Sequence, residues 1–289
     1  MENIVWYPGH IAKARREIKE HIKDVDIVIE IIDARCPLSS INFLNEEIKN
    51  KKRLIILNKI DLADEDELKK FNKDVVSKEI KSEFDGEILF LNSKNNNIKK
   101  LVDKKIDILA KSIYERNKNK GIENTLVKAM VVGMPNVGKS TFINSYVRKK
   151  VNKVENTPGV TKALKWTKIS DKLLLLDTPG VTIKKFESND KGINLALVGS
   201  INDDIIEKVD LAYQFVKKTY KKYYKLFVQR FKLNDIDENV EALTVLNKIA
   251  ENNHFYKKNG DIDYDKTANL IINDFRKGNI GNISLETIE

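Results

Sequence analysis

The chain has 289 residues, a formal net charge of +9 and a single cysteine, Cys36. One cysteine excludes an intramolecular disulfide, and the lack of an apolar signal segment at the N-terminus and of any apolar run of about 18 residues predicts a cytoplasmic protein that makes no membrane contact. The net positive charge favours an acidic partner such as nucleic acid, although a composition rich in Lys, Asn and Ile can also reflect an AT-rich genome.

The N-terminal segment predicts a turn followed by a basic helix. Trp6-Tyr7-Pro8-Gly9-His10 has the composition of a turn, and the residues from Ile11 to Ile22 carry the apolar spacing of an amphipathic helix. The three histidines of the chain are too scattered along the sequence to predict a zinc site.

Three apolar runs after this helix predict buried parallel strands that alternate with charged helices. The runs lie near Val25–Ile32, Leu54–Leu57 and Glu87–Leu91. The second run ends in Asn58-Lys59-Ile60-Asp61, and ligands of open α/β sheets bind outside the carboxyl ends of the strands. The carboxylate of Asp61 would accept hydrogen bonds from the ring N–H and the exocyclic amine of guanine, a pair of donors that adenine lacks. We therefore expect a guanine nucleotide, bound by Asn58, Lys59 and Asp61.

The third strand predicts another contact to the base. It ends in Asn92-Ser93-Lys94, at the place for a loop whose backbone caps the guanine oxygen. Lys94 stands where such loops favour alanine, so the assignment of Ser93 to the nucleotide site rests on its position after the strand.

A phosphate-binding loop follows the next strand. A Lys/Asn-rich connector is expected over residues 113–124, and the apolar run Val127–Val132 then leads into Gly133-Met134-Pro135-Asn136-Val137-Gly138-Lys139-Ser140. This Gly-x4-Gly-Lys-Ser pattern cradles phosphates with backbone N–H groups at a helix N-terminus. Lys139 would reach the β- and γ-oxygens, and the hydroxyl of Ser140 would bind Mg²⁺. The predicted nucleotide contacts in this segment are Asn136, Val137, Gly138, Lys139, Ser140 and Thr141.

Two segments after the phosphate loop have the pattern of nucleotide-sensing switches. Thr157-Pro158-Gly159-Val160-Thr161 places a hydroxyl in a turn-rich segment, and Thr161 is the candidate for a second Mg²⁺ ligand. The apolar run Leu173–Leu176 continues into Asp177-Thr178-Pro179-Gly180, where Asp177 would hold Mg²⁺ through water and the N–H of Gly180 would face the γ-phosphate. This tetrapeptide alone would be an ordinary turn, and its order after the phosphate loop decides the assignment.

The order of these motifs defines the expected fold. In the usual Ras-like order the guanine-specificity motif follows the phosphate loop, whereas here Asn58-Lys59-Ile60-Asp61 precedes it. The fold class is therefore α/β, with a circularly permuted Ras-like P-loop GTPase domain over residues 1–185 and a small all-helical domain over residues 191–289.

The catalytic position departs from the Ras-type scheme. Val181 follows Gly180, and its apolar side chain cannot orient an attacking water as glutamine does. Asn136 could offer its amide oxygen to a K⁺ ion that offsets the charge developing between the β- and γ-phosphates, although asparagine is also a common turn former. His10 could swing toward the γ-phosphate to position water, although a lone histidine beside aromatic residues is often a packed or surface residue.

The residues from Lys191 onward predict helices, because apolar residues recur there at helical spacing. Their most basic surface is Lys217-Lys218-Thr219-Tyr220-Lys221-Lys222-Tyr223-Tyr224-Lys225. The ammonium groups could pair with RNA phosphates while the tyrosine rings stack on bases or ribose. The alternative is a solvated helix with its tyrosines packed inward.

The set of motifs resembles that of the ribosome biogenesis GTPase A family over nearly the full length of the chain. The segments that carry the resemblance are Trp6–His10 with Ala12–Ala14, Asp33–Pro37, Asn58–Asp61, Pro135–Ser140, Pro158–Thr161, Asp177–Gly180 and Tyr264–Thr267. The resemblance implies a GTPase that acts late in assembly of the large ribosomal subunit, with turnover that K⁺ stimulates and the ribosomal particle accelerates. It also implies that His10 replaces the missing glutamine. Tyr7 and Ile11 stand where Phe and Met are common, and neither touches the expected chemistry.

Two other functions are compatible with parts of the sequence. A GTP-dependent RNA-binding switch with negligible turnover is permitted by Val181. An ATP-using enzyme with the same phosphate loop is disfavoured by Asp61. We expect GTP, Mg²⁺ and K⁺ as ligands, the large ribosomal subunit or its assembly intermediate and its rRNA as partners, and a monomer off the ribosome.

Overall fold

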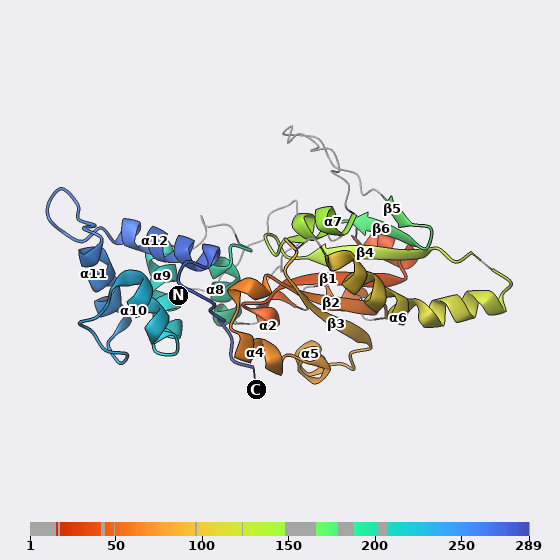
Figure 1. The fold of residues 1–289 in the computed structure, drawn as a ribbon, viewed down its shortest axis with the longest axis horizontal. Coiled ribbons are helices and arrows are strands. Elements are labelled where there is room, and N and C mark those ends of the chain that lie inside the picture. Colours follow the sequence, from red (N-terminus) through yellow and green to blue (C-terminus); the bar gives the residue numbers. More distant parts are fainter. Residues whose placement is uncertain are drawn as a thin grey trace.

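The computed structural model describes residues 16, 18–41, 44–48, 50–95, 97–122, 124–147, 166–178, 188–201 and 207–288. A sheet flanked by helices forms one part of the molecule, and a bundle of helices forms the other (Figure 1). No helix in these ranges is long and apolar enough to cross a membrane.

The sheet contains six strands in the described ranges, in the order β3-β2-β1-β4-β6-β5. The strands are β1 (Ile27–Asp33), β2 (Lys52–Asn58), β3 (Gly86–Leu91), β4 (Val127–Gly133), β5 (Trp166–Ser170) and β6 (Leu173–Asp177). All neighbours pair in parallel except β5, which is antiparallel to β6. Every residue of β1 is buried, because helices cover both faces of such a sheet. The carboxyl ends of the parallel strands therefore meet at one edge, where the expected motifs lie.

Helices and short turns connect these strands. They are η1 (Ile22–Asp24), α2 (Pro37–Ser40), α3 (Asn45–Ile48), η2 (Ile60–Leu62), α4 (Glu65–Lys70), α5 (Lys73–Ile80), α6 (Ile98–Asn119) and α7 (Lys139–Val147). The pairing of β1 with both β2 and β4 confirms the permuted order, because the strands that come first in the sequence lie beside the strand that leads into the phosphate loop.

The expected connector over residues 113–124 is shorter than predicted. Helix α6 continues to Asn119, and Ile113 in its last third is buried. The reason is that Ile113 extends the apolar face of α6 four residues beyond Leu109. Burial of this face stabilises the helix through its last two turns, although their composition is polar. The connector in the described ranges is thus confined to the residues after Asn119.

The C-terminal part consists of α8 (Asn189–Leu197), α9 (Lys208–Thr219), α10 (Tyr224–Phe231), α11 (Ala242–Asn252) and α12 (Tyr264–Lys277). Aromatic rings form its centre, with the Phe215 ring centroid 4.6 Å from that of Phe275 and 5.8 Å from that of Phe227. These rings are contributed by three different helices, and they belong to the same hydrophobic cluster as buried residues of the sheet part.

Polar contacts join the helical part to the sheet part. The Lys222 ammonium lies 2.6 Å from Glu67 Oε1, and the Tyr223 hydroxyl donates to Asp64 at 2.9 Å. The segment after α12 then returns to the sheet part, where the backbone N–H of Ile288 donates to Glu67 Oε2 at 3.0 Å and the Glu286 carboxylate accepts from two N–H groups of α2. The division of the chain between residues 185 and 191 remains a proposal, because the last residues pack on the first part.

These contacts bear on the tyrosine part of the two interpretations of the Lys/Tyr tract. Tyr220 and Tyr223 are buried, and the Lys218 ammonium bonds Asp190 and Asn194 within the protein. The prediction that these two tyrosine rings stack on bases is therefore wrong, because the aromatic packing of the bundle and the Asp64 hydrogen bond hold them inward. Lys217, Lys221 and Lys225 remain exposed.

Candidate functional site

The phosphate loop lies between β4 and α7, at the carboxyl edge of the sheet. Its tight turn depends on two residues with positive φ, Asn136 at 60° and Gly138 at 97°. A Cβ on Gly138 would lie 2.2 Å from the side-chain nitrogen of Asn58, so glycine is required for both the backbone conformation and the close approach. The loop therefore closes directly against the guanine-specificity motif.

Asn58 ties three loops together. Its side-chain nitrogen donates to the Val137 carbonyl at 2.7 Å, and its side-chain oxygen accepts from the Ser93 backbone N–H at 2.9 Å. The side chain is buried, and its two partners fix which end of the amide carries the nitrogen. One asparagine thus joins the end of β2 to the phosphate loop and to the loop after β3, which is the arrangement expected around a bound guanine nucleotide.

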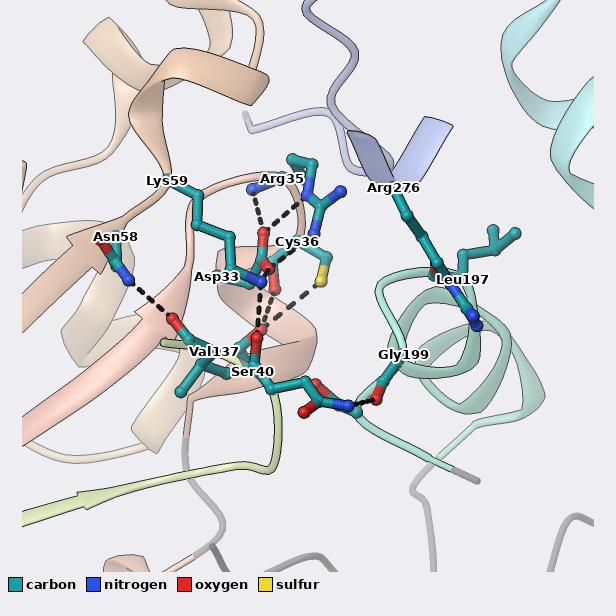
Figure 2. A network of polar contacts seen from close by, with 12 residues as sticks. Asp33, Arg35, Cys36, Ser40, Asn58, Lys59, Val137, Leu197, Gly199 and Arg276 are labelled. Carbon is teal, nitrogen blue, oxygen red and sulfur yellow. Dashed lines mark hydrogen bonds and ion pairs between the residues drawn. The ribbon is translucent and has the colours of Figure 1, made fainter. Parts of the chain in front are cut away.

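Lys59 extends this junction to β1. Its backbone is left-handed at φ 63°, and its ammonium lies 2.5 Å from the Asn136 carbonyl and 2.8 Å from Asp33 Oδ2 (Figure 2). Arg35 also holds Asp33, through Nε at 2.9 Å and Nη2 at 2.8 Å. Burial raises the pKa of the Asp33 carboxyl, but the charges of Arg35 and Lys59 together hold that pKa far below its usual value. Asp33 is therefore a fixed anion that anchors two cations below the phosphate loop.

The residues expected to read the base lie next to this network. Asp61 is exposed in η2, directly after Lys59, so its carboxylate is open to a ligand. The Ser93 hydroxyl is buried and has no hydrogen-bond partner among the described residues. An unsatisfied polar atom and an open carboxylate at the same edge fit a polar ring ligand such as guanine.

The phosphate side of the site carries a cation and a carboxylate. Burial lowers the pKa of Lys139, while the nearby Asp177 carboxylate raises it. The Lys139 ammonium has no hydrogen-bond partner in the described part of the chain, which fits a residue that binds phosphate oxygens.

Asp177 is the last residue of β6 and lies in register with Val131. The Thr178 hydroxyl holds this end of the strand in place by donating to the Val131 carbonyl at 2.7 Å. Ser140 is exposed at the start of α7, so Ser140 and Asp177 would hold Mg²⁺, which screens the phosphate charge.

Three expected site residues lie outside the described residues. These are His10, Thr161 and Gly180. Their roles in catalysis, Mg²⁺ binding and γ-phosphate sensing stay predictions.

Sequence reasoning gave no role to Asp33 and Arg35, which contributed only to the resemblance. The available signal was an acidic residue at the carboxyl end of a buried strand, followed two positions later by an arginine. Arg35 is fully buried, and its guanidinium carbon lies 4.9 Å from the centre of the Phe275 ring in α12. This pair therefore links the nucleotide site to the helical part.

Comparison with known proteins agrees with this geometry. Residues 128–248 match the family model described as "50S ribosome-binding GTPase". Over 99% of its length the chain is 38% identical to "Ribosome biogenesis GTPase A" of Bacillus cereus, of which 94% is covered, and 39% identical to the protein of the same name from Bacillus licheniformis, of which 99% is covered. The chain belongs to the ribosome biogenesis GTPase A family. It is accordingly a GTPase, and the nucleotide assigned to this site is GTP.

A solved structure has the same fold. The GNP-bound YlqF of Thermotoga maritima superimposes with a TM-score of 0.64, at 24% sequence identity, over 96% of this chain and 99% of that one. The expectation of a circularly permuted GTPase fold with a helical C-terminal part is thus confirmed for this family member.

Proposed function

We propose that this family member binds GTP with Mg²⁺ and hydrolyses it as an assembly factor of the large ribosomal subunit, with turnover stimulated by K⁺ and by the ribosomal particle. The observation that carries the proposal is the Asn58 junction, which joins the guanine-specificity motif to the phosphate loop at 2.7 Å and to the loop after β3 at 2.9 Å. The proposed process, ribosome assembly, is based on the relatives named ribosome biogenesis GTPase A. A ribosomal partner would also place the chain in the cytoplasm.

The mechanism divides the work among the residues of the site. Lys139 would neutralise the β- and γ-oxygens, while Ser140 and Thr161 would bind Mg²⁺ and Asp177 would hold it through water. The N–H of Gly180 would face the γ-phosphate. Because Val181 cannot orient water, His10 would position it and Asn136 would bind K⁺ beside the transferring phosphate.

Turnover measurements test the proposal. GTP hydrolysis is measured in K⁺ and in Na⁺, with and without large ribosomal subunits, for the native chain and for His10→Ala. We expect hydrolysis to need both K⁺ and the subunits for its full rate and to fall about 100-fold or more in the variant, the range of a positioned catalytic group. His21→Ala, immediately before η1, is the matched control and should retain the native rate.

The outcomes separate the open alternatives. Stimulation that survives His10→Ala would assign catalysis to the cation or to the ribosome. GTP-dependent binding to the subunit without any stimulated turnover would instead support an RNA-binding switch, which Val181 permits.

The exposed lysines of two surfaces support an RNA partner. Lys100, Lys104, Lys111 and Lys118 form a row along α6 and have no ion-pair partner among the described residues. At about 1.5 Å per residue this row is about 27 Å long. A row of ammonium groups matches the phosphates of an RNA strand, and Lys217, Lys221 and Lys225 offer a second cluster on the helical part. We assign the rRNA contact to these two lysine surfaces.

Charge reversal tests the two surfaces separately. Lys104→Glu with Lys111→Glu, and Lys217→Glu with Lys221→Glu, are each expected to weaken binding to large ribosomal subunits about 10-fold or more and to reduce the slope of log affinity against log salt by about 2. Lys78→Glu with Lys81→Glu, two exposed lysines at the end of α5, is the matched control. Native affinity and native salt slope in both test variants would contradict the assignment.

A further inference from the structure

A turn of the helical part contacts the phosphate loop directly. The Asn136 side-chain nitrogen donates to the Gly199 carbonyl at 2.6 Å, and the hydroxyl of the buried Ser200 donates to the Pro135 carbonyl at 2.8 Å. Two consecutive residues after α8 thus bond two consecutive residues of the loop, although more than 60 positions separate them in the sequence.

The shape of this turn is fixed by the end of α8. The Ser200 N–H bonds the Leu195 carbonyl at 2.8 Å, and the Gly199 N–H bonds the Ala196 carbonyl at 2.9 Å. Gly199 is left-handed at φ 77°, which completes the glycine-terminated helix end known as a Schellman motif. The Gly199 carbonyl that receives Asn136 is therefore held by a defined helix terminus.

Arg276 of α12 braces the same terminus. Its Nε donates to the Leu197 carbonyl at 3.0 Å and its Nη2 donates to the Ala196 carbonyl at 2.8 Å (Figure 2). Both carbonyls lie in the last turn of α8, where a cation is favoured by the helix dipole. A Cβ on Gly199 would lie 3.6 Å from the guanidinium carbon of Arg276, so the side chain packs directly on the turn.

We propose that Arg276 is a positioning residue for the phosphate-loop Asn136, acting through Gly199. An amide carries its nitrogen and its oxygen on opposite sides, so the hydrogen bond to Gly199 commits the nitrogen and reserves the oxygen for a cation. This inference rests on the proposed role of Asn136 in K⁺ binding. It adds that the helical part determines whether the amide oxygen of Asn136 faces the cation, because the arginine that holds the Gly199 turn belongs to α12.

The consequence is a path from the partner surface to the catalytic cation. Residues 188–201 follow the switch that begins at Asp177 and end on the phosphate loop, while α12 packs against α9, which carries Lys217. A partner that shifts α12 would loosen or tighten the Gly199 turn, and the affinity of Asn136 for K⁺ would change with it. This gives a physical route by which a bound particle alters hydrolysis.

Equilibrium binding of a fluorescent, non-hydrolysable GTP analogue in K⁺ and in Na⁺ tests the inference without relying on turnover. K⁺ that binds beside the nucleotide must raise nucleotide affinity by the same factor as the nucleotide raises K⁺ affinity. In Arg276→Ala we expect the ratio of affinities in the two salts to fall toward 1, and the K⁺ concentration for half-maximal hydrolysis to rise about 10-fold. The affinity in Na⁺ should stay within about twofold of native, because the base and phosphate contacts are intact.

Two further variants make the outcomes distinguishable. Lys277→Ala removes the neighbouring basic residue of α12, which is exposed, and it should keep the native ratio. If Asn136→Ala leaves the ratio unchanged, the proposed K⁺ site itself is wrong. If Asn136→Ala abolishes the K⁺ effect while Arg276→Ala behaves like Lys277→Ala, the K⁺ site stands and the positioning role of Arg276 is refuted.

Discussion

Replacing Asp61 by asparagine is expected to change the base preference of this GTPase from guanine to xanthine. The carboxylate of Asp61 is exposed at the carboxyl end of β2, where it would accept from two donors of guanine. An asparagine presents one acceptor and one donor group, which suits the additional oxygen of xanthine. Two hydrogen bonds to a charged group contribute about 3–6 kcal/mol, so GTP affinity should fall about 100-fold or more while XTP affinity rises.

Competition between GTP and XTP for binding measures this change. Asp66→Asn serves as the control, because this aspartate is also exposed, five residues further along in α4. The Asp61 variant should also hydrolyse XTP at a rate near that of native GTP turnover, since no phosphate contact is altered. A variant that still prefers GTP would place base recognition at another residue, with the unsatisfied Ser93 hydroxyl as the first candidate.

Five of the six described strands could be predicted, because each is a short apolar run that ends in a polar motif. The antiparallel strand β5 was not predicted, because its residues are partly polar and none of them is buried. Leu54–Leu57 lies inside β2 and the run Val127–Val132 inside β4, and the motif that follows each run lies at the carboxyl edge. The hydrophobic pattern of buried parallel strands is local, so it is visible in the sequence. The end of α6 could not be placed from composition, because its Lys/Asn-rich last turns depend on the burial of Ile113.

The parts of the site that escaped prediction are contacts between distant segments. The Asn136 side chain donates to the Gly199 carbonyl, and the Leu285 N–H donates to the Arg35 carbonyl at 2.7 Å. Neither contact corresponds to a local pattern in the sequence.

The contact of Lys222 could not be predicted either. In the sequence this lysine belongs to a basic tract, whereas in the structure it pairs with Glu67. Hydrogen bonds from Ile288 N–H, Lys222 and Lys70 outweigh the burial that would raise the pKa of Glu67, and they lower it to about 2. A lysine in a basic tract can thus form an ion pair inside the protein, and the sequence alone does not show its partner.

Asp33→Asn is expected to cost both stability and GTP affinity. The substitution keeps the shape of the side chain but leaves the cations of Arg35 and Lys59 without their buried anion. Breaking a buried ion pair in this way costs about 3–5 kcal/mol of unfolding free energy, measurable by denaturant titration. GTP affinity should fall about 10-fold in addition, because Lys59 is no longer held against the Asn136 carbonyl of the phosphate loop.

Glu30→Gln separates the two effects. Glu30 of β1 forms a buried ion pair with Arg53 at the amino end of β2, and the site lies at the carboxyl end of these strands. Its loss should therefore reduce stability and leave GTP affinity near native. The pH dependence gives a second criterion. Because the folded-state pKa of Asp33 lies far below its unfolded value, its contribution is present above about pH 4 and is lost only as the pH falls toward the folded pKa. The stability difference between native chain and Asp33→Asn should therefore be constant from pH 7 to about pH 5. A difference that shrinks within that range, or equal GTP affinities in the two variants, would show that Asp33 does not act as the fixed anion of the nucleotide site.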